Sequence, residues 1–226
     1  MKLNTLHNRR FGKFSKKISF IIFISFLSVA AFSQSDTIRY EAGIATVAST
    51  GSYAPFWLHS DRYGKISSSP MSTLAFTGIE KQYTNTRNKF DYGFKAGAIV
   101  RTDYHKNEIY LNEIYIKARY AVFNIMAGSR EQIFGNQDST LSSGGLLFSK
   151  NARPMPEISA GIENFTPVPL TFGFLELKGS MRQGWFTDNI YTRGIMLHHK
   201  FGYVRLGGKL PVHVQYGLEH VAQWGG

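Results

Sequence analysis

The chain contains no cysteine. This absence excludes a disulfide-stapled scaffold, a thiol nucleophile and any zinc or iron–sulfur site built on cysteine ligands. Charged residues are also scarce, at 18% of the 226 residues, whereas Phe, Trp and Tyr together reach 15%. So aromatic a composition is not typical of a disordered protein and instead indicates a folded chain.

Acidic residues are missing from the first 17 residues, which carry six Lys and Arg side chains. The whole chain has a formal net charge of +11, but without this segment 20 basic and 15 acidic residues remain. Most of the excess positive charge therefore lies at the N-terminus. We expect no nucleic-acid partner, because a nucleic-acid-binding surface would need basic residues within the folded part.

An apolar run follows the basic segment and covers residues 18–32. Ala31 and Ser33 then place small residues at the positions that signal peptidases require. The run of about 15 residues is shorter than the ~20 that a helix needs to cross a bilayer, which disfavours the alternative of an N-terminal membrane anchor. We predict a secretory signal peptide over 1–33, cleaved after Ser33, and one exported domain over 34–226.

The exported domain lacks a second long apolar run, and its hydrophobic period is two rather than 3.6. A period of two is typical of β-strands, in which successive side chains point to opposite faces. The alternation is clearest where Phe90, Tyr92 and Phe94 alternate along the chain with polar residues such as Asp91 and Lys95. Runs of this kind predict about nine strands, at roughly 39–48, 72–79, 90–104, 108–120, 122–130, 157–163, 170–181, 192–206 and 212–219.

Two all-β architectures have such strands. A soluble sandwich would bury the apolar set in a core, whereas a transmembrane antiparallel β-barrel would turn it toward lipid and line its lumen with the charged set. The strongly ionic polar set, the aromatic residues near strand ends and the longer connections at 130–156 and 181–190 favour the barrel. A barrel in lipid must close. This chain reaches Gly226 without a closing strand, so we expect only the first part of a larger barrel.

Several short segments occur in a fixed order along the chain and together resemble the outer-membrane capsule assembly protein Wzi family, in its Bacteroidetes-like branch. They are FGNQ at 134–137, LSSGGL at 141–146, SKNARPMP at 149–156, KG at 178–179, GWF at 184–186, LHHK at 197–200, GLEH at 217–220 and QWGG at 223–226. The resemblance covers most of 40–226. It implies a barrel of roughly 18 strands that attaches capsular polysaccharide to the outer membrane and has no enzymatic activity.

Residues for polysaccharide binding can be named only as hypotheses. Asn151 and Arg153 would present donors to an acidic polymer, although the flanking prolines also suit a loop that is merely fixed in place. Trp185, with Arg182 beside it, would stack on a sugar ring, and so would Trp224. An aromatic girdle at the membrane boundary is the alternative for both tryptophans.

The charged faces of the strands predict a polar network in the lumen. Its members are Asp91, Lys95, Arg101, Asp103, Lys117, Arg119, His198, Lys200, His213 and Glu219. His199 is assigned to the outer face with Leu197 and Phe201. Neighbours on a strand point apart, so His198 and His199 cannot share an ion and no metal site is expected.

Motifs for catalysis are missing from the sequence. No G-x-S-x-G elbow surrounds a serine, and no G-K-[ST] follows the glycines at 144–145. We expect no enzyme and no cofactor, with outer-membrane lipid and surface polysaccharide as partners. A porin or transporter is the second hypothesis, and an outer-membrane hydrolase is the third.

Overall fold

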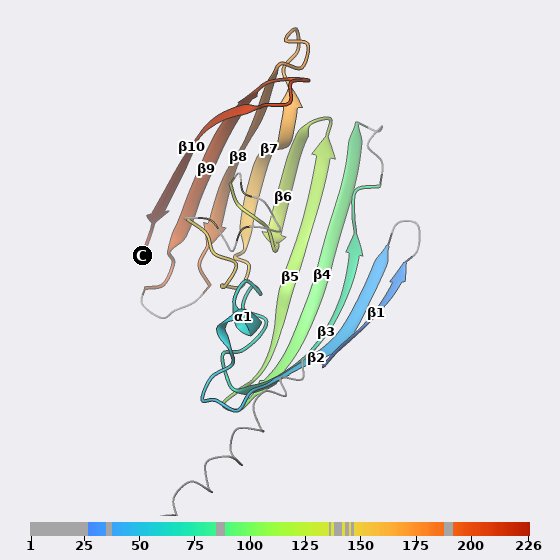
Figure 1. Ribbon diagram of the computed structural model, residues 1–226, viewed down its shortest axis with the longest axis vertical. Coiled ribbons are helices and arrows are strands. Elements are labelled where there is room, and N and C mark those ends of the chain that lie inside the picture. The colour runs from blue at the N-terminus through green and yellow to red at the C-terminus, as the bar shows by residue number, and fades with distance from the viewer. Residues whose placement is uncertain are drawn as a thin grey trace, which may run out of the picture.

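The chain folds into one antiparallel β-sheet with almost no helix in the computed structural model (Figure 1). The all-β prediction is therefore confirmed. The structure describes residues 27–34, 38–84, 89–135, 137, 142, 145, 147–187 and 192–226.

Each strand pairs with its neighbours in sequence, in the order β1-β2-β3-β4-β5-β6-β7-β8-β9-β10. The strands are β1 Leu27–Gln34, β2 Arg39–Ala48, β3 Met71–Lys81, β4 Phe90–Asp103, β5 Asn107–Tyr120, β6 Phe123–Ser129, β7 Glu157–Pro167, β8 Leu175–Trp185, β9 Met196–Leu206 and β10 Val214–Trp224. The nine predicted strands correspond to β2–β10. In the described part of the chain β1 does not pair with β10, so the sheet is open and is not a closed barrel.

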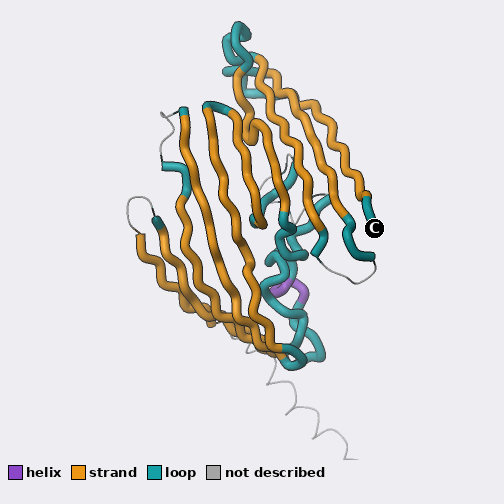
Figure 2. The backbone as a smooth tube through the Cα atoms, turned by 180° about the vertical axis from the view of Figure 1, so that it is seen from behind, coloured by secondary structure: helices purple, strands orange, loops and turns teal. Residues whose placement is uncertain are grey.

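The long connections all lie at one end of the sheet, together with the short β4–β5 turn at 104–106. The long ones are 49–70, which contains α1 (Phe56–His59), together with 130–156 and 186–195. Figure 2 shows the helix at the end of the sheet where these loops gather. The connection expected at 181–190 begins later, because β8 continues to Trp185. None of the described helices is long and apolar enough to cross a membrane.

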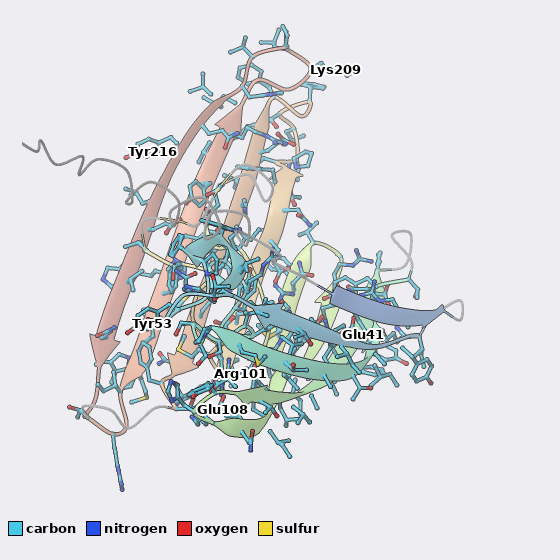
Figure 3. The ribbon with its side chains drawn as sticks, turned by 60° about the horizontal axis from the view of Figure 1, so that its bottom comes forward. Glu41, Tyr53, Arg101, Glu108, Lys209 and Tyr216 are labelled. Carbon is cyan, nitrogen blue, oxygen red and sulfur yellow. The ribbon has the colours of Figure 1, made fainter. Side chains whose placement is uncertain are left out.

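The sheet is strongly curved, and its two faces differ in what covers them. Seen from the end that carries α1, it curves around the helix and the loops attached to it (Figure 3). We call the face that α1 and the segments 49–70 and 130–156 contact the inner face, and the opposite one the outer face. Because side chains alternate along each strand, every strand contributes to both faces.

The usual distribution of polar and apolar residues is reversed across this sheet. Buried polar or charged residues of the inner face include Glu80, Asp91, Glu113 and Arg182. The outer face instead exposes large apolar side chains along most strands. Examples are Tyr40, Ile44, Phe90, Tyr92, Val100, Ile109, Leu111, Ile114, Ile116, Phe123, Ile125, Ile158, Met181, Tyr216 and Leu218.

One small apolar core occupies the inner face beneath the segment 49–70. It contains Ala45, Leu74 and Ile99, and Ile66 from the covering segment packs against it. An inward-pointing isoleucine such as Ile99 is buried here because the loop supplies an apolar partner. This core fixes 49–70 against β2–β4.

The predicted cleavage site lies within strand β1. It pairs with β2 from Leu27 opposite Thr46 to Gln34 opposite Arg39. Cleavage after Ser33 would remove all of β1 except Gln34 and make β2 an edge strand. We expect the exported protein to begin at Gln34, which N-terminal sequencing and the intact mass of the protein from cell envelopes would measure. A mature chain that still contains 27–33 would contradict the predicted signal peptide.

Candidate functional site

The inner face carries a continuous set of ion pairs, which begins at β2–β5. The Lys95 Nζ lies 3.3 Å from Glu41 Oε1 and 2.5 Å from Glu113 Oε2. Arg39 pairs in the same way with Glu80. Glu41 and Glu113 come from β2 and β5, so Lys95 of β4 links carboxylates of two other strands across the sheet.

A β-bulge in β5 brings a second polar side chain to this cluster. The register of β4 and β5 shifts so that Gly97 faces Glu113 and Ala98 faces Leu111, which leaves Asn112 as the extra residue. Asn112 and Glu113 are both buried. Asn112 donates to the Glu131 side chain, and the Glu131 N–H donates to Glu113 Oε1 at 2.9 Å. The bulge therefore anchors the start of the long connection 130–156.

Further toward the opposite end of the inner face, Asp91 lies between two cations. Its carboxylate is 3.8 Å from Lys81 Nζ and 3.7 Å from the Arg119 guanidinium. Lys117 lies on the same face and donates a hydrogen bond of 2.6 Å to Gln82 Oε1. The structure thus brings Asp91, Lys117 and Arg119 together on one face, as the alternation of their strands predicts.

At the end that carries α1, Glu108 forms ion pairs with three cationic side chains. Arg101 and Arg153 each approach its Oε2 at 2.5 Å, and Lys106 pairs with its other oxygen. Arg101 also donates to the Gly64 carbonyl at 2.8 Å, and the Arg153 guanidinium lies 3.6 Å from the centre of the Tyr110 ring. Figure 3 shows Arg101 and Glu108 close together.

The predicted ligand residues Asn151 and Arg153 therefore have structural partners. Asn151 Oδ1 accepts a hydrogen bond of 2.8 Å from the Asp61 N–H, and the Lys150 carbonyl accepts one from the Tyr63 N–H. Burial, with a smaller contribution from the charge of Glu131, raises the pKa of Tyr63. These contacts join 49–70 to 130–156, which is the loop-fixing role weighed for this segment.

A second buried cluster lies on β7–β9. Arg182 donates to Glu157 Oε1 at 3.1 Å, and Gln132 donates to the same oxygen at 2.6 Å. The side chains of Arg182 and Glu157 are 7% and 2% exposed. The Phe134 ring covers Arg182, with its centre 4.7 Å from the guanidinium carbon. Arg182 is thus a buried partner of Glu157 in this structure.

His199 lies on the inner face, so its predicted outer position is wrong. It is 1% exposed, packs against the rings of Phe134 and Phe148, and has its Nε2 3.6 Å from Glu219 Oε2. Glu219 also accepts a hydrogen bond from the Tyr203 hydroxyl. The apolar residues around His199 face inward because the aromatic rings of 130–156 cover them.

Three members of the predicted lumen network consequently lie elsewhere. His198 and Lys200 flank His199 and point to the outer face, where Lys200 is exposed. His213 precedes β10, is exposed, and has its ring Nε2 3.1 Å from the Gly208 carbonyl. Asp103 was also expected in the network. Its carboxylate instead accepts hydrogen bonds from the backbone N–H groups of His105 and Lys106 and so caps the β4–β5 turn.

Two polar cavities remain on the inner face below 130–135. The larger has a volume of about 460 Å³. The smaller, of about 100 Å³, is lined by the cations Arg130, Lys178 and Arg182 together with Glu163. Arg130 and Gln132 line both cavities. The inner face can therefore hold water or small ions between its ion pairs.

The predicted tryptophans point to the outer face at the ends of their strands. Trp185 and Trp224 both lie opposite Met196, so they share one row across β8–β10. They are 37% and 51% exposed. The structure therefore separates them from Arg182, Asn151 and Arg153, and the five residues do not form one site.

No motif in the sequence marks the exposed aromatic residues at the end that carries α1. Tyr53, Phe56 and Trp57 in 49–70 are 74%, 69% and 68% exposed, and Tyr104 in the β4–β5 turn is 77% exposed. Arg101 bonds to the Gly64 carbonyl and so holds β4 against this segment. Their position at one end of the sheet depends on that packing, which no local pattern in the sequence reveals.

Within the described ranges, no group of three or more His, Asp or Glu side chains is placed to hold a metal ion. No family model, no curated protein and no solved structure matches the chain.

Proposed function

We propose that the chain forms part of a transmembrane outer-membrane β-barrel that binds surface polysaccharide and acts in capsule assembly without catalysis, as its resemblance to the Wzi family implies. The observation that carries this proposal is the reversed polarity of the sheet. A soluble sheet buries its apolar face, but here large apolar side chains such as Ile109 and Leu218 are 80% and 69% exposed.

The positions of the connections support the same proposal. Outer-membrane barrels have short turns on the periplasmic side and longer loops on the cell surface. The connections 49–70, 130–156 and 186–195 all lie at one end of this sheet. That end would face the outside of the cell.

An open sheet cannot span a bilayer, because the edges would leave backbone groups without hydrogen-bond partners in hydrocarbon. The proposal therefore requires strands that pair with β10 and with the opposite edge. They would come from the same polypeptide or from another copy of it.

The polysaccharide would bind at the long-loop end. Exposed aromatic rings of Phe56, Trp57 and Tyr104 lie at that end of the sheet, and so do cationic side chains, of which Arg153 is 42% and Lys106 is 66% exposed. Flat rings stack on sugars while nearby cations attract the carboxylates of an acidic polymer. Many weak contacts along one polymer would add up to firm attachment.

The substitution Trp57→Ala tests this site. We expect binding of the purified full-length protein to capsular polysaccharide to weaken about fivefold, the equivalent of one lost aromatic contact of ~1 kcal/mol. The fold should persist because the side chain is 68% exposed. The measurement is polysaccharide affinity, together with capsule retention on cells that carry the variant gene.

Leu210→Ala is the matched control, since Leu210 is 57% exposed in the turn at the opposite end. It should leave both readouts unchanged. Equal retention of capsule by cells with and without the whole gene would refute the proposed function.

The ionic inner face also favours a second candidate, a porin. Its polar cavities, the larger of about 460 Å³, would then belong to a water-filled path. Planar-bilayer recordings distinguish the two. Steady open channels would support the porin, whereas silence would support a lumen filled by 49–70 and 130–156.

A further inference from the structure

The smaller cavity of the inner face lies between the start of the connection 130–156 and strand β8. Its volume of about 100 Å³ is that of about three water molecules. Arg130 and Gly135 line it from the connection, and Lys178 and Arg182 line it from β8. The cavity therefore separates two parts of the chain that are distant in sequence and that pack against each other here.

Three cationic side chains face this cavity, but only one carboxylate does. That carboxylate belongs to Glu163, whose Oε1 lies 3.4 Å from the Arg130 guanidinium. Arg182 pairs at 3.1 Å with Glu157, which does not line the cavity. Each arginine thus has one carboxylate partner, and the charge of Lys178 remains to be balanced.

Lys178 has only neutral partners among the described residues. Its Nζ donates to the Gly135 carbonyl over a long distance of 3.4 Å, and the ring centres of Phe201 and Tyr203 lie 5.9 and 6.0 Å away. Glu219 lies near Gly135 but accepts the Tyr203 hydroxyl, and no described carboxylate forms an ion pair with Lys178. A half-buried ammonium without a counterion is unfavourable, so the described side chains leave one positive charge to be compensated.

Hydrogen-bond donors around the cavity also lack acceptors. The Arg182 side chain is 7% exposed, and its Nε is buried without a hydrogen-bond partner in the described part of the chain. Lys178 has three N–H donors, and the long bond to Gly135 uses one of them. Buried donors normally have an acceptor. A carboxylate supplies two acceptor oxygens and one negative charge, whereas water would leave the charge uncompensated.

The rest of the lining includes apolar side chains. Ile133 and Phe201 provide this part of the surface. An alkyl group attached to the carboxylate can lie against them. The volume limits the ligand to about four heavy atoms, the size of acetate, which excludes a sugar ring.

We propose that this cavity binds a small monocarboxylate. Its oxygens would accept hydrogen bonds from Arg130 and Lys178, because guanidinium and ammonium groups pair strongly with carboxylates. Its alkyl group would contact Ile133 and Phe201. The bound anion would stabilise the contact between 130–135 and β8. The inference goes beyond polysaccharide binding and does not depend on it, because it rests on the inner face alone.

The test is the affinity of acetate for the full-length protein purified in detergent, measured by isothermal titration calorimetry. Sodium chloride keeps the ionic strength constant. We expect the wild type to bind acetate and Lys178→Met to bind it about tenfold more weakly, which is the effect of one lost hydrogen bond between charged groups. The variant should fold, since no ion pair with a described carboxylate is broken.

Urea unfolding provides a second measurement on the same proteins. A ligand that binds only the folded state stabilises it. Acetate should therefore raise the unfolding midpoint of the wild type above its value in chloride at equal ionic strength. The midpoint of Lys178→Met should be the same in both salts. A Lys178→Met variant that gains as much stability from acetate as the wild type does would overturn the site.

Lys117→Met is the matched control. Lys117 also lies on the inner face and donates to a neutral group, Gln82, but it lines the larger cavity and not the smaller one. This variant should bind acetate as the wild type does. An equal loss of affinity in Lys117→Met would show a general positive potential of the inner face and would overturn a specific site. Chloride that competes with acetate at equal concentration would overturn the assignment to a carboxylate.

Discussion

Ile116→Arg is expected to prevent the chain from assembling in the outer membrane. Ile116 lies in the middle part of β5, points to the outer face and is 60% exposed. A soluble sheet would accept arginine at such an exposed position with a change within about 0.5 kcal/mol. On the lipid face of a barrel, arginine near the bilayer midplane costs about 2–4 kcal/mol. The amount of full-length protein in purified outer membranes measures the difference.

Leu210→Arg provides the control for this substitution. Leu210 has a similar exposure, 57%, but lies in the β9–β10 turn. The cost of arginine falls to about 0–1 kcal/mol near the membrane interface, so this variant should assemble. Normal assembly of Ile116→Arg would mean that the outer face does not contact lipid, and the membrane proposal would fail.

Arg182→Met is expected to destabilise the fold by about 3 kcal/mol. The substitution leaves Glu157, whose side chain is 2% exposed, as a buried charge without its cation. Gln132 still donates to that carboxylate, which keeps the loss at the lower end for a broken buried pair. Guanidinium unfolding of the detergent-solubilised protein, followed by circular dichroism, measures the change.

Arg205→Met is the matched control from the next strand. The Arg205–Glu176 pair is more accessible, with side chains 29% and 14% exposed, so its loss should shift the unfolding curve much less than Arg182→Met does. If Arg182 were instead a polysaccharide ligand, Arg182→Met would weaken polysaccharide binding and leave the unfolding curve unchanged. That result would contradict the structural role assigned to the buried pair.

The strands could be predicted because alternation is a local property. A period of two is visible in β4, where Phe90, Asp91 and Tyr92 already show which positions share a face. The bounds were less predictable. The sequence predicts a strand from residue 170, whereas β8 begins at Leu175 and the preceding residues form a turn.

Which face an apolar set occupies could not be predicted as reliably. In β9 the apolar residues Leu197 and Phe201 point inward with His199, opposite to the expectation for a lipid-facing set. Phe134 and Phe148, distant in sequence, supply the apolar cover for them. Alternation defines two faces, but only the packing of a distant loop decides which of them is covered.

The amino-acid sequence by itself determined an all-β chain whose strands carry a charged set and an apolar set on opposite faces, and it predicts an N-terminal signal peptide. These follow from composition and short-range periodicity. Tertiary structure alone decided that Arg153 reaches Glu108, that Lys200 points outward, and that the exposed rings of 49–70 lie at the same end of the sheet as Tyr104. Such contacts join residues far apart in sequence, and they depend on register, on the bulge in β5 and on where the long connections pack.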